Sequence, residues 1–192
     1  MNVKSEVLGM LYQSRGKTVS GEFIADKLGI SRAAVWKAIN GLKKDGYAVV
    51  SERNKGYVLS VRDDKLSAEG IGLLASDFLP FVYEEIDSTN DEAKRLAIEY
   101  PDKNLIVAAN SQRCGRGRRG RSFYSPESTG VYFSVVIHPD ISPEKSVLVT
   151  TAAALATAEV IEELTGRRAL IKWINDVYVD GRKCVGILTE AT

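Results

Sequence analysis

Arginine and glycine crowd into one short segment, NSQRCGRGRRGRSFY, which spans residues 110–124 and is called the Arg loop below. The crowded residues are Arg113, Arg116, Arg118, Arg119 and Arg121, with Gly115, Gly117 and Gly120 between them. Arginine is rarely buried without a partner, and its guanidinium binds phosphate through two parallel hydrogen bonds. Glycine lets backbone N–H groups approach an anion closely. The segment therefore predicts a flexible cationic loop that binds a multiply anionic ligand, between strands that include residues 105–109 and 131–137.

Other interpretations of the Arg loop exist on composition alone. It could be a solvated basic loop, or a nucleic-acid contact. Its three glycines also satisfy the G-x-G-x-x-G spacing of dinucleotide-binding folds, and Asp140 follows about 20 residues later, as that fingerprint asks. The dinucleotide interpretation fails, because that fingerprint must open a crossover helix. Here residues 122–130 contain Pro126, and strand-forming residues follow directly.

A second polar cluster, Asp87-Ser88-Thr89-Asn90, stands between a predicted strand and a predicted helix over residues 91–99. These residue types cap helix N-termini. The cluster is therefore a simple N-cap or, alternatively, a ligand site, because a helix start presents free N–H groups and hydroxyls.

A third polar cluster lies in IKWINDVY, residues 171–178, where Lys172, Asn175 and Asp176 interrupt a predicted apolar strand. Buried charges must be paired or functional, so the alternatives are an ion pair within a hairpin or a site. A turn at residues 180–181 predicts a second strand over 182–189, with Lys183 near its start.

The elements before these clusters predict a separate domain. Helical spacing of apolar residues near 7–12, 20–28 and 32–44, with a glycine-containing turn at 29–31, is typical of a helix-turn-helix. A hairpin with its tip at 54–56 follows, and the whole resembles a winged helix. We expect the third helix and the wing to contact DNA through Ser31, Arg32, Trp36, Lys37, Arg53 and Lys55. The alternatives are a winged helix that contacts only proteins, and a core position for Trp36.

Charge supports this division of the chain. Residues 1–62 carry 11 Lys and Arg against 5 Asp and Glu, a net +6, whereas the other 130 residues carry 15 against 20, a net −5. Such asymmetry is typical of a segment that meets a polyanion joined to a domain with another role. We expect a DNA-binding domain at 1–62, a linker with short helices at 63–80 and a second domain at 81–192.

Several classes of protein are disfavoured. No apolar run approaches the roughly 20 residues that span a bilayer, and no signal peptide opens the sequence. Two distant cysteines and one histidine, His138, offer no Cys/His metal site. We therefore expect a cytoplasmic protein with no membrane partner and no protein-bound metal centre.

The three clusters together resemble the biotin protein ligases. GRGRRGR is similar to that family's biotin-and-adenylate loop, IDSTN to its ligand-binding turn, and KWIND to the KWPND signature of biotin and lipoate ligases. With a winged helix in front, the whole is similar to the bifunctional members that also repress a biotin operon. The resemblance implies an α+β chain: a winged helix-turn-helix followed by a mixed-sheet α/β ligase domain that is incomplete at its C-terminus.

The resemblance also implies an activity. Biotin and MgATP would give biotinyl-5′-adenylate, which would biotinylate a lysine of a biotin carboxyl carrier protein. Operator DNA would be a second partner, and an adenylate-bound homodimer is expected. Catalytic roles would fall to Lys183, Arg118, Asp176 and Lys172. Biotin or adenylate would be bound by Ser88, Thr89, Asn90, Gln112, Gly115, Arg116, Gly117, Arg118, Arg119, Arg121, Phe123, Asn175 and Lys183.

The sequence departs from the family pattern in two places. Ile174 stands where the signature usually has proline, and Phe123 where relatives often have tryptophan, although either aromatic ring can cover an adenine. Two other functions stay open: a lipoate ligase, and a DNA-binding biotin sensor without turnover.

Overall fold

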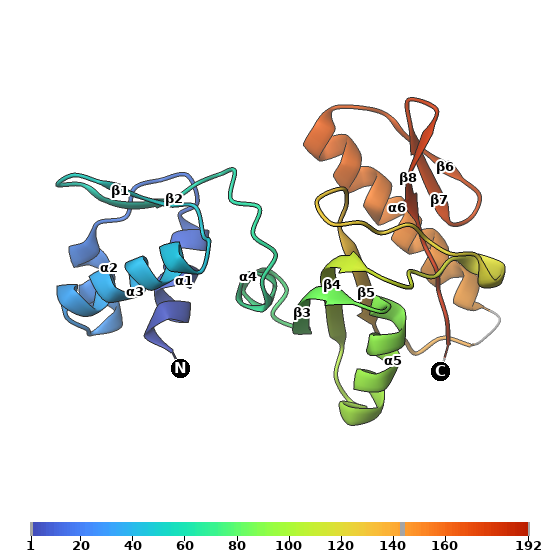
Figure 1. Cartoon of the computed structure of the whole chain (residues 1–192), viewed down its shortest axis with the longest axis horizontal. Helices are drawn as coiled ribbons and strands as arrows, with labels where there is room; N and C mark the ends of the chain where they lie inside the picture. Colours follow the sequence, from blue (N-terminus) through green and yellow to red (C-terminus); the bar gives the residue numbers. More distant parts are fainter. Residues whose placement is uncertain (1, 143–144, 192) are drawn as a thin grey trace. The chain divides into compact units, whose positions relative to one another are not determined.

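A computed structural model describes residues 2–142 and 145–191 and divides between Val82 and Tyr83 into two compact units (Figure 1). The first unit contains a three-helix arrangement and a β-hairpin. The second contains two small sheets with a helix packed on each. Helices and strands are mixed throughout, as the sequence predicts. Within the described residues, no helix is both long enough and apolar enough to cross a membrane.

The first unit begins with three helices: α1 (Val3–Gln13), α2 (Gly21–Leu28) and α3 (Arg32–Lys44). Serine caps the second and third helices as predicted, because Ser20 Oγ accepts the Phe23 N–H at 3.0 Å and Ser31 Oγ accepts the Ala34 N–H at 3.1 Å. Gly29, at φ 63°, ends α2 in the left-handed conformation that glycine adopts without strain. The short turn between α2 and α3 is therefore fixed by local sequence.

The core of this unit is the apolar face of each helix. Apolar spacing predicts an inward face on α1 and α3, and most of its positions are buried: Val7, Leu8, Leu11, Val35, Ile39 and Leu42. Tyr12, predicted on the same face of α1, is half-buried. Phe23 of α2 is instead half-exposed, because the buried side chains of that short helix are Ile24 and Ala25.

The wing is an antiparallel hairpin of β1 (Val49–Glu52) and β2 (Gly56–Leu59), with Val49 opposite Leu59. Asn54 and Gly56 both have positive φ and form the predicted tip. A Cβ on Gly56 would lie 2.1 Å from the Val19 carbonyl oxygen, so glycine is required where β2 meets the segment before α2.

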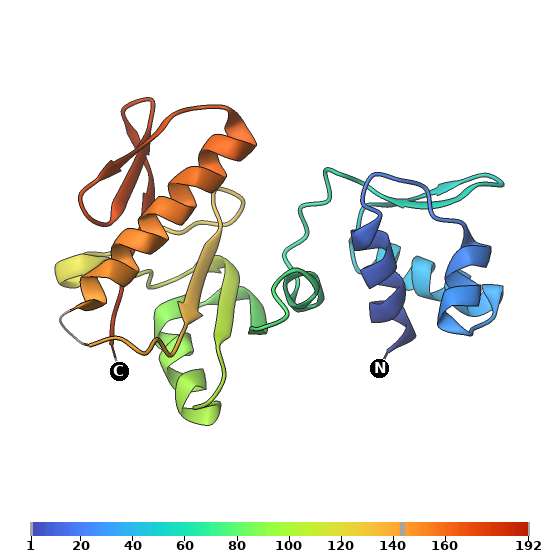
Figure 2. The same ribbon diagram turned by 180° about the vertical axis from the view of Figure 1, so that it is seen from behind.

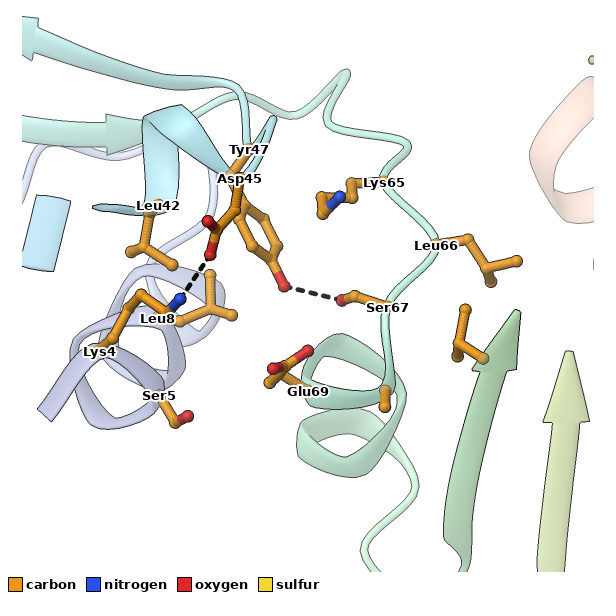
Figure 3. A pocket seen from close by; sticks show the side chains of 12 residues that line it. Lys4, Ser5, Leu8, Leu42, Asp45, Tyr47, Lys65, Leu66, Ser67 and Glu69 are labelled. Carbon is orange, nitrogen blue, oxygen red and sulfur yellow. Dashed lines mark hydrogen bonds and ion pairs between the residues drawn. The ribbon is translucent and has the colours of Figure 1, made fainter. Parts of the chain in front are cut away.

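The sequence of the segment after the wing favours one helix or two short ones over residues 66–79. The structure has one helix there, α4 (Ala68–Leu74). Ser67 caps α4 and also accepts a hydrogen bond from the Tyr47 hydroxyl at 2.9 Å. A hollow of about 310 Å³ lies beside this bond, lined by α1, the end of α3 and the residues around Ser67 (Figure 3). Leu79, predicted to be helical, is instead the first residue of a strand.

The first sheet of the second unit has the order β3–β4–β5, from strands β3 (Leu79–Ile86), β4 (Leu105–Gln112) and β5 (Tyr132–Val136). Helix α5 (Thr89–Glu99) connects β3 to β4 and packs on the sheet. Just after β4, the Arg113 N–H donates to the Ile86 carbonyl and the Cys114 N–H to the Asp87 carbonyl. Residue numbers rise together along the two chains, so β3 and β4 run parallel. β5 returns antiparallel to β4, and the Arg loop connects these two strands.

The second sheet is an antiparallel meander of β6 (Ala169–Lys172), β7 (Asp176–Val179) and β8 (Arg182–Gly186). Helix α6 (Ser146–Thr165) runs along it (Figure 2). Ala154 and Ala158 are buried, as expected of the alanine-rich helix that the sequence predicts over residues 143–164, because small residues let a helix pack closely on a sheet. The predicted start of this helix, residues 143–144, lies outside the described residues.

The prediction of one continuous strand over residues 171–178 was wrong. Residues 173–175 form a turn, and the two ends pair as β6 and β7, with Lys172 opposite Asp176. Lys172 is also exposed, so the assumption that these polar groups interrupt a buried strand does not hold for it. The turn at Asp180 and Gly181, both with positive φ, connects β7 to β8 as predicted.

Candidate functional site

One group of polar side chains gathers where α5 begins beside the ends of β4 and β5, and is called the hydroxyl cluster here. Gln112 Oε1 accepts from the Thr89 N–H at 2.8 Å and from the Thr89 hydroxyl at 3.1 Å. The Ser134 hydroxyl donates to Thr89 Oγ1 at 2.8 Å and also contacts Asn90 Oδ1. Thr89, Asn90 and Gln112, named separately from the sequence, are therefore joined in one network.

Ser88 lies outside the hydroxyl cluster. Its hydroxyl accepts the Asp91 N–H at 3.4 Å and is fully buried, so it caps α5. Asp87 reinforces this helix start: the Ser88 backbone N–H and the Arg95 guanidinium hold the pKa of its carboxyl below the ordinary value. The N-cap interpretation of this turn is thus correct for Ser88, while its neighbour Thr89 belongs to the hydroxyl cluster.

The Arg loop follows a defined path. Its two arms are joined by hydrogen bonds from the Phe123 N–H to the Gly115 carbonyl at 2.7 Å and from the Gly117 N–H to the Arg121 carbonyl at 2.7 Å. A short 3-10 turn, η1 (Arg118–Gly120), forms its tip. Gly115 is essential to this path, because a Cβ there would lie 2.3 Å from the Phe123 carbonyl oxygen.

A second group, called the cationic cluster here, forms where the tip of the Arg loop reaches the second sheet. Arg118 Nη1 donates to Asn175 Oδ1 at 2.7 Å, and Asn175 Nδ2 donates to Asp176 Oδ1 at 2.9 Å. Lys183 Nζ donates to the same Asp176 oxygen at 2.8 Å. A cation from the loop and a cation from β8 are thus oriented by one amide and one carboxylate.

Phe123 brings the loop against β8. A Cβ on Gly186 would lie 3.0 Å from Phe123 Cε2 and 3.1 Å from Lys183 Nζ, so ring and ammonium lie beside the same glycine. An aromatic ring next to a lysine and an arginine suits a planar group joined to a phosphate. Of the predicted adenylate residues, Arg118, Phe123, Asn175 and Lys183 are brought together, and they are joined by Asp176, which was predicted to be catalytic.

The cationic cluster does not include Lys172, Arg119 or Arg121. Lys172 lies over the Tyr178 ring, with Nζ 5.7 Å from the ring centroid, on the exposed end of β6. Arg119 and Arg121 are exposed on the loop. Arg119 has φ 57° and belongs to the tip that turns the chain.

Arg116 is paired with carboxylates. Its guanidinium contacts Asp91 of α5 and donates to Glu190 Oε1 at 3.3 Å. Glu190 also accepts from Asn90 Nδ2 at 3.2 Å and pairs with Lys94 at 3.1 Å. Burial alone would raise the pKa of Glu190, but Lys94, Asn90 and the charge of Arg116 together lower it.

Sequence reasoning missed Ser134, Asp91 and Glu190. Ser134 had a signal, because it is one polar residue within the apolar strand segment VYFSVVI. Asp91 and Glu190 had none, since ordinary surface carboxylates occur throughout the chain. A hollow of about 460 Å³ lies beside Gln112, Gly115, Phe123 and Ser125, so it meets the hydroxyl cluster at Gln112.

The first unit presents a separate surface. Ser31, Arg32, Trp36 and Lys37 are all exposed on the first half of α3, and Arg53 and Lys55 are exposed on the wing. Trp36 is 62% exposed, which excludes the core position considered for it within this unit. The Arg32 guanidinium contacts Glu22 of α2. An exposed tryptophan beside basic residues on the second helix of a helix-turn-helix fits a nucleic-acid contact.

Comparison with known proteins covers both units. The Biotin/lipoate A/B protein ligase family model matches residues 82–192, and an HTH domain model matches residues 4–58. The chain is 38% identical, over 98% of its length, to the bifunctional ligase/repressor BirA of Bacillus subtilis (strain 168), and covers 59% of that protein. It is 34% identical, over 93% of its length, to the protein of the same name from Escherichia coli (strain K12), and covers 56% of it.

Solved structures similar to this chain include biotin protein ligases. A biotin protein ligase from Aquifex aeolicus in complex with biotin and ATP is 32% identical, with a TM-score of 0.50 over 59% of this chain and 47% of that one. A Leishmania major biotin protein ligase in complex with biotinyl-5-AMP is 25% identical, with a TM-score of 0.53 over 59% and 52%. The chain spans somewhat more than half the length of the curated relatives it matches.

Proposed function

This chain belongs to the biotin/lipoate A/B protein ligase family, and from that premise we propose that it makes biotinyl-5′-adenylate from biotin and ATP and transfers biotin to a carrier-protein lysine. We propose further that its helix-turn-helix makes it a biotin-responsive repressor. The supporting observation is the meeting of Arg118 with Asn175, Asp176 and Lys183 at one place, next to Phe123.

In the first step, a carboxylate oxygen of biotin attacks the α-phosphorus of ATP, and the bond to pyrophosphate breaks. Negative charge builds on the phosphoryl oxygens, so cations held in place beforehand lower the barrier. Arg118 and Lys183 are the cations for this role, because Asn175 and Asp176 hold them. Phe123 lies where it would cover the adenine.

In the second step, the acceptor lysine amine attacks the acyl carbon of the adenylate, and AMP leaves. The attacking amine must lose a proton, and Asp176 is the carboxylate in the cationic cluster able to take it. The ureido head of biotin presents N–H donors and a carbonyl acceptor. Gln112 Nε2 keeps one N–H beyond its bond to Ser125, and Thr89 Oγ1 keeps one acceptor site beyond its bond from Ser134. These two groups would bind that head, with Ser88 fixing the turn below them.

Magnesium would enter with ATP. Mg²⁺ is commonly held by one or two carboxylates together with substrate phosphates rather than by an all-protein cage. Asp176 is the carboxylate beside the phosphate-binding cations and would be the protein ligand in that pattern. Magnesium would there offset the charge of the phosphates.

The DNA-binding proposal places Ser31, Arg32, Trp36 and Lys37 in the major groove or on its phosphates, and Arg53 and Lys55 of the wing on the backbone or minor groove. A repressor of this kind acts as a homodimer on a two-fold operator. The proposed partners are therefore operator DNA, a biotin carboxyl carrier protein and a second copy of the chain, all in the cytoplasm.

Isothermal titration of this chain with biotin, and then with a non-hydrolysable biotinyl-adenylate analogue, tests the proposal. We expect both to bind, the analogue more tightly because it adds the phosphate and adenine contacts. Binding of neither would reject it. ATP–pyrophosphate exchange with biotin and with lipoate then separates the two ligase specificities. Ligand-dependent operator binding without biotinyl transfer would favour the sensor without turnover.

A further inference from the structure

Arg116 differs from the other arginines of the Arg loop in its ion-pair partners. Its guanidinium lies between two carboxylates, Asp91 on the first turn of α5 and Glu190 after the end of β8. A guanidinium whose charge is already balanced by two carboxylates is a weak ligand for a further anion, because the carboxylates would repel that anion. Arg118, in contrast, donates to the neutral amide of Asn175 and keeps its charge available.

Glu190 connects the segment after β8, to which it belongs, with the Arg loop and with α5. One carboxylate oxygen accepts from Arg116 of the loop at 3.3 Å, and the other accepts from Asn90 at 3.2 Å and Lys94 at 3.1 Å, both on α5. Its side chain is 25% exposed, so these contacts are less screened by water than surface pairs. With Asp91 the cluster contains two negative and two positive side chains, and its charge is balanced.

We infer that Glu190 and Asp91 are positioning residues that hold the Arg loop closed through Arg116, which serves as a strut and not as a phosphate ligand. The inference rests on the proposed function and adds to it. Glu190 lies outside the sequence motifs of the site. Only its contacts in the structure connect it with the Arg loop.

The contacts of Arg116 and Glu190 are connected to the hydroxyl cluster, where the ureido head of biotin is proposed to bind. Asn90, which donates to Glu190 through Nδ2, contacts Ser134 through Oδ1, and Ser134 donates to Thr89 of the hydroxyl cluster. The contacts of Arg116 stop the arm of the loop that begins at Gln112 from lifting away from α5. Loss of the strut should therefore loosen the cover over any ligand in the site, whether or not that ligand carries a phosphate.

The test uses Glu190→Gln, Asp91→Asn and Arg116→Gln, with Lys94→Gln as the matched control, because Lys94 binds the same Glu190 but does not contact the loop. Two quantities are measured on the whole chain: the rate of tryptic cleavage after Arg118, Arg119 and Arg121, which every variant keeps, without ligand, and the dissociation rates of biotin and of the non-hydrolysable biotinyl-adenylate analogue. Retained circular dichroism establishes that each variant is folded.

We expect the three strut variants to be cleaved about fivefold faster and to release both ligands about fivefold faster, the size of effect of one half-exposed ion pair. The double variant Arg116→Gln with Glu190→Gln should be no worse than either single variant, because the two residues act through each other. Lys94→Gln should behave as the parent chain.

The inference is overturned if Arg116→Gln weakens the adenylate analogue alone while Glu190→Gln and Asp91→Asn change nothing, since Arg116 would then be a phosphate ligand. Unchanged cleavage in Glu190→Gln and Asp91→Asn overturns it as well, and that readout needs no ligand. If cleavage rises as expected while the parent chain binds neither ligand, the strut stands and the proposed ligase function fails.

Discussion

Gly115 lies where the two arms of the Arg loop meet. An added Cβ would lie 2.3 Å from the Phe123 carbonyl oxygen and 2.6 Å from Ser125 Oγ, so Gly115→Ala must push the arms apart. We expect a loss of about 1–3 kcal/mol in the free energy of unfolding, as for other overpacked sites, and weaker binding of the biotinyl-adenylate analogue. Chemical denaturation and titration measure the two effects.

Gly120→Ala is the comparison for that substitution. Gly120 has φ +71° but open space around it, so alanine there costs only the left-handed backbone, about 1–2 kcal/mol. Analogue binding should be affected less than in Gly115→Ala. Equal effects of the two substitutions on binding would show that backbone conformation, and not the close approach of the arms, governs the loop.

Glu190 also gives the molecule a dependence on pH. Its pKa in the folded chain is lowered from the ordinary 4.5, so below that value the unfolded chain binds more protons than the folded one. The stability that Glu190 contributes is therefore present above about 4.5 and lost as pH falls through the lowered folded pKa. We expect Glu190→Gln to cost about 1 kcal/mol at pH 7 and progressively less in acid, measured by urea unfolding. A cost independent of pH would contradict this assignment.

Helix α3 carries the proposed contact with DNA. Lys37 is exposed on it, whereas Arg32 is engaged with Glu22. We expect Lys37→Glu to weaken binding of an operator fragment at least tenfold and to reduce the slope of log affinity against log salt by about 1. Lys103→Glu, an exposed lysine of the other unit, changes net charge equally and should leave binding nearly unchanged. A similar loss in both variants would indicate only a general charge effect.

At the scale of elements, sequence predicts best where the signal is local. Ser20 and Ser31 cap their helices, and Asp180 and Gly181 form their turn, because each of these depends on a few neighbouring residues. The segment 171–178 was mistaken for one strand because its apolar residues are nearly continuous. Its true form, a hairpin, depends on the pairing of Lys172 with Asp176 and on β8 beyond it, which no local pattern encodes.

In the candidate site, too, the sequence predicts what depends on local residue types and misses what depends on contacts between distant residues. The residue types of the Arg loop and of residues 88–90 and 175–176 singled out Arg118, Thr89, Asn175 and Asp176, and the resemblance to the biotin protein ligases added Gln112. Sequence could not show that Arg116 is balanced by Asp91 and Glu190, because those partners lie 25 and 74 residues away along the chain. Nor could it place Lys172 over Tyr178, outside the cationic cluster.

At the scale of the whole molecule, opposite charge on the two units agrees with their proposed roles. The N-terminal segment of net +6 would meet DNA, and the remaining segment of net −5 has five of its 15 Lys and Arg residues in the Arg loop. A response of DNA binding to biotin therefore requires the state of the second unit to change how the first unit meets DNA. A change in the number of chains that assemble is one way to couple them, because two linked DNA-binding units bind a two-fold operator far better than one does.

The Arg loop suggests how a ligand would control such assembly. Its glycines make the empty loop costly to order, and an adenylate bound between Arg118, Lys183 and Phe123 would offset that cost. We expect sedimentation velocity to give a monomer for the chain alone and a dimer with the biotinyl-adenylate analogue, and operator affinity to rise with the dimer. Glu190→Gln, which loosens the loop, should require more analogue for the same dimer fraction, while Lys94→Gln should not. An unchanged mass with saturating analogue would reject coupling through assembly and leave repression to changes within a single chain.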